Sequence, residues 1–183
     1  MSRVSRNQWP LVLVEGELTL RPLRIRDRGA WLSVRRKNRE WLNKWEATSP
    51  IPEENRNLPT FIEMVQFHSR EGRAGRSLSL AIWFNSVLIG QITLGGISYG
   101  AYRGGHIGYW ISESYANKGL TTRAVRELTR YGLEELRLHR IEINQDLRMR
   151  HRNGLLRKPV MSSKEFARAT YILTGIGAIT SVM

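Results

Sequence analysis

Hydrophobic residues follow two different periods in the first third of the chain. Within residues 16–27, Leu18, Leu20 and Leu23 alternate with polar residues, which is typical of a strand with one buried face. Asp27 follows as a residue that helices favour at the N-cap. Residues 28–47 then carry apolar side chains at helical spacing: Trp31, Val34, Trp41, Leu42 and Trp45. The pattern predicts a strand and then one or two amphipathic helices.

Another helix and an antiparallel meander are predicted from residue 60 onward. Thr60 and Glu63 have the spacing of a capping box at a helix start. The helical face that follows is formed by Phe61, Met64, Val65 and His68. Runs of mainly apolar residues come next, at residues 77–84, 87–96 and 106–112. A turn at residues 85–86 and a glycine-containing loop separate these runs, so they are predicted to pair as neighbouring strands.

The segment after the meander has a strand, a loop, a helix and a second strand in succession. The first strand is predicted to end at Ser112 and the second to cover residues 141–144, with a helix between them whose inward side carries Ala124, Val125, Leu128 and Leu136. A helix N-terminus offers unpaired N–H groups and positive potential, which suit a pyrophosphate. In the loop, Asn117 tolerates a left-handed backbone and Gly119 permits close approach. Taken alone, such a pattern is more often an ordinary turn.

Composition and charge narrow the class of protein. The 183 residues suffice for one domain with a hydrophobic core, so residues 1–183 are interpreted as a single domain. The absence of cysteine excludes disulfides and thiolate sites and fits the cytoplasm. No signal peptide or long apolar segment is present, so we expect neither export nor a membrane partner. The net charge of +13 suggests an anionic partner or, equally well, a solvated basic surface.

Several short motifs resemble the GCN5-related N-acetyltransferase (GNAT) superfamily, and within it the RimJ/RimL branch. They are NREWLNKWE at residues 38–46, HIGYWI at 106–111, KGLTTRAV at 118–125 and LHRIEIN at 138–144. The resemblance covers residues 16–144. It implies an α/β (α+β) fold with a mixed, mostly antiparallel sheet flanked by helices. It also implies a cytoplasmic transferase that uses acetyl-CoA without a metal and acetylates protein N-terminal amines, typically of ribosomal proteins.

The resemblance also implies roles for individual residues. The pyrophosphate of acetyl-CoA would lie on the loop formed by Asn117, Lys118, Gly119, Leu120, Thr121 and Thr122, in which Asn117 and Thr121 depart from the family's usual small residues. Further cofactor contacts would come from the strand ends, at Trp110, Ile111, Ser112 and Asn144. Backbone N–H groups of residues 110–112 would hold the thioester carbonyl. Glu46 is the candidate catalytic or acceptor-binding carboxylate, and an ordinary solvated glutamate fits its position equally well.

The histidines and tryptophans are given structural interpretations. His106 is expected to be an ordinary strand residue and His139 a packing residue, although both could be proposed as bases. The tryptophans at positions 31, 41, 45, 83 and 110 lie on periodic apolar faces and are expected in the core rather than against RNA bases.

Residues 145–183 do not fit the family pattern. The RimJ/RimL branch continues with R-P-E-N-x-x-S and later with Y-L-x-I-D-G-x-W-R-D-H, whereas this chain ends in TYILTGIGAITSVM. Codons can be chosen for residues 172–183 such that a second reading frame, in which each new codon starts at the third base of an old one, encodes I-D-G-D-W-R-D-H-I-S-Y. We therefore expect an out-of-frame tail caused by loss of one base near residue 145, with a divergent C-terminus as the alternative. Such a tail should make few core contacts, leave a strand edge unpaired and impair the chain.

Two other functions remain open at this point. One is a noncatalytic basic module that binds RNA or the ribosome, and the other is an acetyltransferase for a small-molecule amine. Acetyl-CoA binding that depends weakly on salt would favour an acetyltransferase, whereas RNA affinity that falls steeply with salt would favour the basic module. Substrate assays would separate the two kinds of acetyltransferase.

Overall fold

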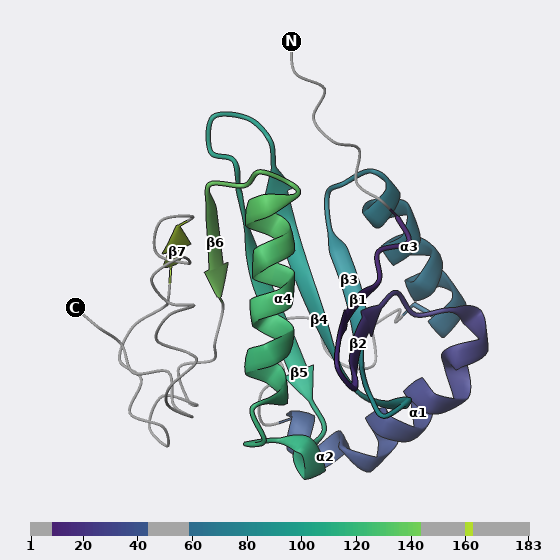
Figure 1. Cartoon of the computed structure of the whole chain (residues 1–183). Coiled ribbons are helices and arrows are strands. Elements are labelled where there is room, and N and C mark those ends of the chain that lie inside the picture. The colour runs from purple at the N-terminus through teal and green to yellow at the C-terminus, as the bar shows by residue number, and fades with distance from the viewer. Residues whose placement is uncertain (1–8, 44–58, 144–159, 163–183) are drawn as a thin grey trace.

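A seven-stranded sheet forms the centre of the molecule (Figure 1). The computed structural model describes residues 9–43, 59–143 and 160–162. The strands are β1 (Leu13–Glu15), β2 (Leu18–Arg21), β3 (Leu78–Phe84), β4 (Val87–Ser98), β5 (Gly104–Ile111), β6 (Arg140–Ile143) and β7 (Val160–Ser162). The helices are α1 (Arg28–Lys37), α2 (Arg39–Asn43), α3 (Phe61–Arg73) and α4 (Leu120–Glu134), with short 3-10 helices η1 (Ile25–Asp27) and η3 (Glu113–Tyr115).

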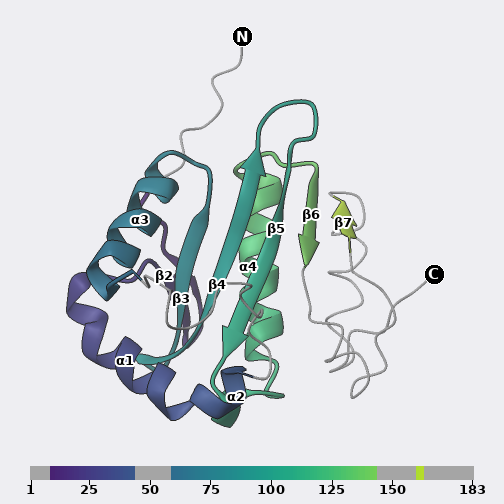
Figure 2. The same ribbon diagram turned by 180° about the vertical axis from the view of Figure 1, so that it is seen from behind.

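The strands lie in sequence order and are antiparallel except for β5 and β6, which are parallel. A parallel pair needs a crossover connection, and α4 supplies it. Figure 1 shows α4 against one face of the sheet, and Figure 2 shows the same helix behind the sheet. The expected fold class, a mixed and mostly antiparallel sheet flanked by helices, is therefore confirmed.

Apolar side chains pack on both faces of the sheet. The larger core lies between the sheet and α4 and includes Leu80, Ile82, Ile92, Leu94, Ile107, Ala124 and Leu128. The smaller core lies on the opposite face, where Val34 of α1 packs with Ala81 and Leu88 against Leu23, Trp31, Trp83 and Trp110. The core interpretation of the tryptophans at positions 31, 83 and 110 is confirmed, while position 45 lies outside the described residues.

The predicted turns and caps have identifiable geometry. The Thr60 hydroxyl accepts a hydrogen bond from Glu63 N–H at 3.3 Å, and the Glu63 carboxylate accepts one from Thr60 N–H at 2.7 Å. This confirms the capping box at the start of α3. Asn85 and Ser86 both have positive φ, as a tight turn between β3 and β4 requires.

Asp27 corrects one expectation. It is the residue before α1, but its side chain caps no N–H group of α1. Its carboxylate instead accepts hydrogen bonds from Arg21 at 2.7 and 3.0 Å and from Arg24 N–H at 2.8 Å. Burial opposes the ionised carboxylate, but these hydrogen bonds outweigh that effect and lower the pKa of Asp27. The residue therefore ties β2 to the turn before α1.

The C-terminal tail also corrects an expectation. Of the residues beyond 143, the structure describes only β7, which pairs with β6 through Arg140–Ser162, Ile141–Met161 and Glu142–Val160. The outer edge of β6 is thus covered over these positions, and the prediction of an unpaired edge is wrong there. The backbone of an extended segment can pair regardless of its side-chain pattern.

Candidate active site

The loop before α4 has the backbone geometry that the sequence predicted. Asn117 and Gly119 both have positive φ, at 58° and 73°, and α4 begins at Leu120. The first helical hydrogen bond joins Arg123 N–H to the Gly119 carbonyl at 3.0 Å. The N–H groups of the three residues before Arg123 therefore lack intrahelical acceptors and point out of the helix end. A Cβ added at Gly119 would meet nothing within 4 Å, so the approach to this backbone is open.

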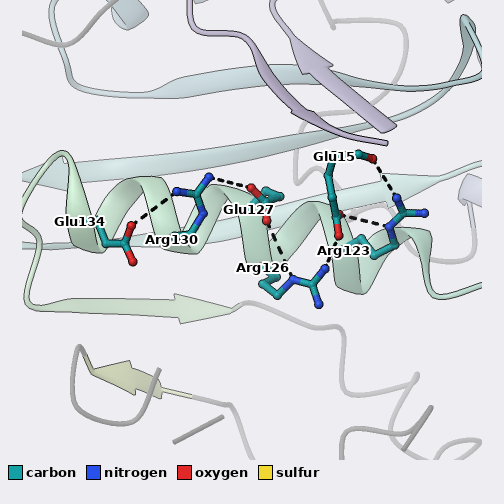
Figure 3. A network of polar contacts seen from close by, with 6 residues as sticks. All are labelled: Glu15, Arg123, Arg126, Glu127, Arg130 and Glu134. Atoms are coloured by element: carbon teal, nitrogen blue, oxygen red, sulfur yellow. Dashed lines mark hydrogen bonds and ion pairs between the residues drawn. The ribbon is translucent and has the colours of Figure 1, made fainter. Parts of the chain in front are cut away.

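An ion-pair network attaches the first turns of α4 to the edge of the sheet (Figure 3). Arg123 donates to the Glu15 carboxylate at 3.2 Å and to the Glu15 carbonyl at 2.8 Å. Arg126 also donates to the Glu15 carboxylate and lies 4.0 Å from Glu127. Since Glu15 ends β1, these contacts set the position of the α4 N-terminus relative to the sheet.

The end of β5 provides one backbone donor rather than three. Ser112 N–H is already bonded to the Ile89 carbonyl at 2.7 Å, so it is not free to hold a ligand. Because N–H groups alternate sides along a strand, Trp110 N–H also faces β4, and Ile111 N–H faces the side of β6. The described β5–β6 pairing ends at Ile107, four residues earlier. The expectation that residues 110–112 all offer N–H groups is therefore corrected to Ile111 alone.

Two side chains that were not expected at this site, Asn38 and Trp41, hold the end of β5 in place. Asn38, at the junction of α1 and α2, is buried. Its carbonyl oxygen accepts hydrogen bonds from Ser112 Oγ at 3.1 Å and Glu113 N–H at 2.9 Å, and its amide donates to the Val34 carbonyl at 2.8 Å. Trp41 donates its indole N–H to the Ile111 carbonyl at 3.1 Å. The two helices therefore bind directly to the strand end that carries the candidate donor.

A groove of about 300 Å³ runs along β4 and β5, and it is lined by Gln91, Thr93, His106, Gly108, Tyr109 and Trp110. The side chains of Gln91, Thr93 and Trp110 project from the sheet face opposite α4, because Trp110 packs in the smaller core and residues alternate along a strand. A Cβ added at Gly108 would meet nothing within 4 Å, so this glycine leaves the groove open. Gln91 and Thr93 hydrogen bond to Ser79 at 2.5 and 3.1 Å.

The structure brings together most, but not all, of the residues singled out by sequence. The loop before α4 and the end of β5 lie at the same end of the sheet, joined by η3. Glu46 and Asn144 lie outside the described residues. His106 is an exposed strand residue that lines the groove. His139 is also exposed, so its interpretation as a packing residue is wrong.

Within the described ranges, no cluster of histidine or acidic residues could hold a metal ion. No helix in the same part of the chain is long and apolar enough to cross a membrane.

Comparison with known proteins decides the family. Residues 17–148 match the model of the acetyltransferase (GNAT) domain family. The chain belongs to the GNAT acetyltransferase family. Members of this family are acetyl-CoA-dependent N-acetyltransferases.

Individual relatives lie in the RimJ/RimL group. The putative ribosomal N-acetyltransferase YdaF of Bacillus subtilis (strain 168) is 28% identical over 131 residues, which cover 71% of this chain and 69% of YdaF. Mycobacterium smegmatis RimJ, solved with CoA-disulfide, superposes with a TM-score of 0.73 at 23% identity, over 91% of this chain and 96% of that one. The ribosomal-protein-S5-alanine acetyltransferase of Vibrio fischeri gives a TM-score of 0.62 at 19% identity, over 73% of each chain.

The described residues fit the co-substrate of this family. The loop before α4 offers helix N-terminal N–H groups, an open glycine backbone and the exposed Lys118, all of which suit a diphosphate. Lys118 Nζ lies 5.3 Å from the Tyr115 ring, which keeps the cation beside the loop. Ile111 N–H is oriented toward the β6 side of β5, four residues beyond the last described β5–β6 pair. These groups are suited to hold the phosphate and thioester ends of acetyl-CoA.

Proposed function

We propose that this chain transfers an acetyl group from acetyl-CoA to the α-amine of a protein N-terminus, specifically that of a ribosomal protein. The main support is the arrangement at the end of β5: the candidate thioester donor Ile111 faces the β6 side, and a groove on the face opposite α4 reaches the neighbouring Trp110. The relatives named above include a putative ribosomal N-acetyltransferase and a ribosomal-protein-S5-alanine acetyltransferase.

The chemistry demands few catalytic groups. The unprotonated amine attacks the thioester carbonyl carbon of acetyl-CoA and forms the C–N bond. The C–S bond then breaks, the amine nitrogen loses one proton, and CoA leaves as a thiolate that takes up a proton to become the thiol. An α-amine has a pKa of about 7.7–8.0, so roughly a tenth to a sixth of it is unprotonated at pH 7, far more than of a lysine amine with a pKa of about 10.4, and a weak base suffices. The Ile111 N–H would stabilise the negative charge that develops on the thioester oxygen. We assign the loop at residues 117–122 to the diphosphate, and Asn144 to a cofactor contact.

The acceptor side is assigned to the groove and to Glu46. Gly108 leaves room for the acceptor residue, and Gln91 and Thr93 provide polar groups along the floor. Glu46 remains our candidate for binding or deprotonating the amine. A small-molecule amine acceptor and a noncatalytic RNA contact are the alternatives. Acetyl transfer to N-terminal peptides, compared with transfer to a small amine and with RNA binding, separates them from this proposal.

Replacing Gly119 tests the cofactor site. The variant Gly119→Val places a branched side chain at a φ of 73° and over the open backbone, so we expect CoA affinity to fall at least about tenfold, equivalent to about 1.4 kcal/mol. Gly29→Val is the matched control, because a Cβ there also meets nothing within 4 Å but no positive φ is required. Calorimetry with CoA measures binding, and mass spectrometry of N-terminal peptides measures acetyl transfer. Equal affinity of Gly119→Val and the unaltered chain would contradict the assignment.

We further propose that residues 145–183 are an out-of-frame tail on a single GNAT domain. The codon argument and the departure from the family's motifs support this proposal. The match to the family model ends at residue 148, which is consistent with it.

A further inference from the structure

We propose that cations at the α1–α2 junction select acceptor proteins whose N-terminal segment is acidic. This inference rests on the function proposed above and specifies the class of acceptor. It follows from the charge around α1, from six exposed cations there that form no ion pair with a described residue, and from the position of the junction beside the groove.

The segment around α1 concentrates positive charge. Residues 21–39 contain eight arginines and lysines, and Asp27 is their only carboxylate. The Asp27 carboxylate forms an ion pair with the Arg21 guanidinium, with 2.7 Å between the nearest nitrogen and oxygen. Six of the remaining cations are exposed, and none of them forms an ion pair with another described residue: Arg24, Arg26, Arg28, Arg36, Lys37 and Arg39.

The arginines of α4 show the opposite arrangement. Arg123 and Arg126 share the Glu15 carboxylate, and Arg130 lies 2.9 Å from Glu127 and 3.5 Å from Glu134 (Figure 3). The described arginines Arg123, Arg126 and Arg130 of α4 are therefore paired with carboxylates, whereas no described carboxylate pairs with the six exposed cations around α1. Cations before and in the first turn of α1 oppose the helix dipole, whereas Arg36 and Lys37 in its last turn are favoured by it.

The junction of α1 and α2 lies beside the candidate acceptor groove. Asn38 is buried and hydrogen bonds to Ser112 and Glu113, just after β5. Its neighbours Lys37 and Arg39 are therefore held next to the end of that strand. Arg35 lies over the Trp110 ring, with 5.4 Å between the guanidinium carbon and the ring centroid, and Trp110 lines the groove. A polypeptide leaving the groove on this side would pass the exposed cations.

An acidic polypeptide fits this surface better than RNA. Single-stranded RNA is bound largely by stacking on available aromatic rings. The nearby rings of Trp31 and Trp110 are instead packed against each other, with centroids 5.5 Å apart and planes at 66°, and both are only partly exposed. Binding of a carboxylate requires only an exposed cation within hydrogen-bonding distance, and an arginine can donate two hydrogen bonds to one carboxylate.

Binding of matched peptides tests the proposal without requiring turnover. Two peptides with a free N-terminal Ala and a C-terminal fluorophore would differ only in their next four residues, Asp-Glu-Asp-Glu or Asn-Gln-Asn-Gln. Fluorescence anisotropy would measure their affinities for the unaltered chain, for R36Q/K37Q/R39Q and for the control R70Q/R73Q/R137Q. The control removes the same charge from exposed arginines, two of which lie in the last turn of α3. That turn lies near the start of β5, since a Cβ added at Gly75 would lie 3.2 Å from the hydroxyl of Tyr99 in the loop before β5.

We expect the acidic peptide to bind the unaltered chain about five- to tenfold more tightly than the amide peptide, from three exposed charge contacts. R36Q/K37Q/R39Q should lose this preference, and the control should keep it. The preference of the unaltered chain for the acidic peptide should also be smaller at about 0.15 M salt than at low salt, which tests the charge effect without a mutation.

Three results would overturn the proposal. The first is equal affinity of the unaltered chain for both peptides, and the second is an equal loss of the acidic-peptide preference in the control variant. The third is a labelled RNA oligonucleotide that binds the unaltered chain more tightly than the acidic peptide does and loses this affinity in R36Q/K37Q/R39Q. Acetyl transfer to the same peptides is measured separately by mass spectrometry. A peptide preference without any acetyl transfer would refute the proposed function and leave the acidic-segment surface standing.

Discussion

Asn38→Ala should be among the most damaging single substitutions in the described part of the chain. The residue is 4% exposed and makes three hydrogen bonds, to Val34, Ser112 and Glu113. Each intramolecular hydrogen bond contributes about 0.5–1.5 kcal/mol, and a buried group left unpaired costs about 1–3 kcal/mol. Loss of all three bonds, with Glu113 N–H left without its acceptor, should lower the free energy of unfolding by about 3 kcal/mol. For a chain of this size, that corresponds to a fall in Tm of about 6–12 °C.

The same substitution should also loosen the end of β5. Because Asn38 holds Ser112 and Glu113, we expect CoA affinity to fall as well, although Asn38 itself does not contact the proposed phosphate site. Asn43→Ala is the matched control, since Asn43 is exposed at the end of α2. Urea unfolding gives the free energy, and calorimetry gives the CoA affinity. A loss below about 1 kcal/mol, or a loss equal to that of Asn43→Ala, would refute the reasoning.

Two further predictions concern the groove and pH. Gly108→Leu should fold and bind CoA normally, because a Cβ at this position meets nothing within 4 Å. Its side chain should fill the groove, so we expect peptide acetylation to be lost. Unchanged peptide turnover, measured by mass spectrometry, would exclude the groove as the acceptor site. Asp27 has a lowered pKa, so its stabilising effect is present above the ordinary value of about 3.9 and is lost as pH falls through the lower folded value. Asp27→Asn should therefore destabilise the chain by about 1–3 kcal/mol at neutral pH. In thermal melts, the difference from the unaltered chain should shrink below about pH 4; a constant difference would contradict this.

Much of the fold was predictable because it depends on local chemistry. The period of the apolar residues identified α1, α3 and the meander, and the Thr60–Glu63 spacing identified the start of α3. The left-handed residues Asn117 and Gly119 were predictable because few residue types adopt positive φ without strain. These features are determined by residues within one or two turns of each other.

The parts that sequence reasoning missed depend on distant partners. The availability of an N–H group at residues 110–112 depends on which neighbour each one faces, and the bond from Ser112 to Ile89 spans the β4–β5 hairpin. The role of Asn38 depends on a contact 74 residues away along the chain. A buried asparagine between two helices could have indicated a tertiary contact, but its partner could not be read from spacing. His139 was misassigned because periodicity does not distinguish a packed from an exposed residue at the end of a connection.

Re-inserting one base near codon 145 should restore both stability and activity. The sequence replaced by the altered frame would supply the family's last helix and strands, and the stability of a whole domain is only about 5–15 kcal/mol. Pairing of β7 with β6 protects part of the strand edge, so the unaltered chain should remain partly folded rather than aggregate through that edge. We therefore expect a lower Tm and weaker acetyl transfer for the unaltered chain than for the restored chain. Thermal melting and peptide acetylation of the two versions side by side decide the question. If the unaltered chain melts cooperatively at the same temperature and turns over as fast, its residues 145–183 are a working C-terminus and the frameshift hypothesis is wrong.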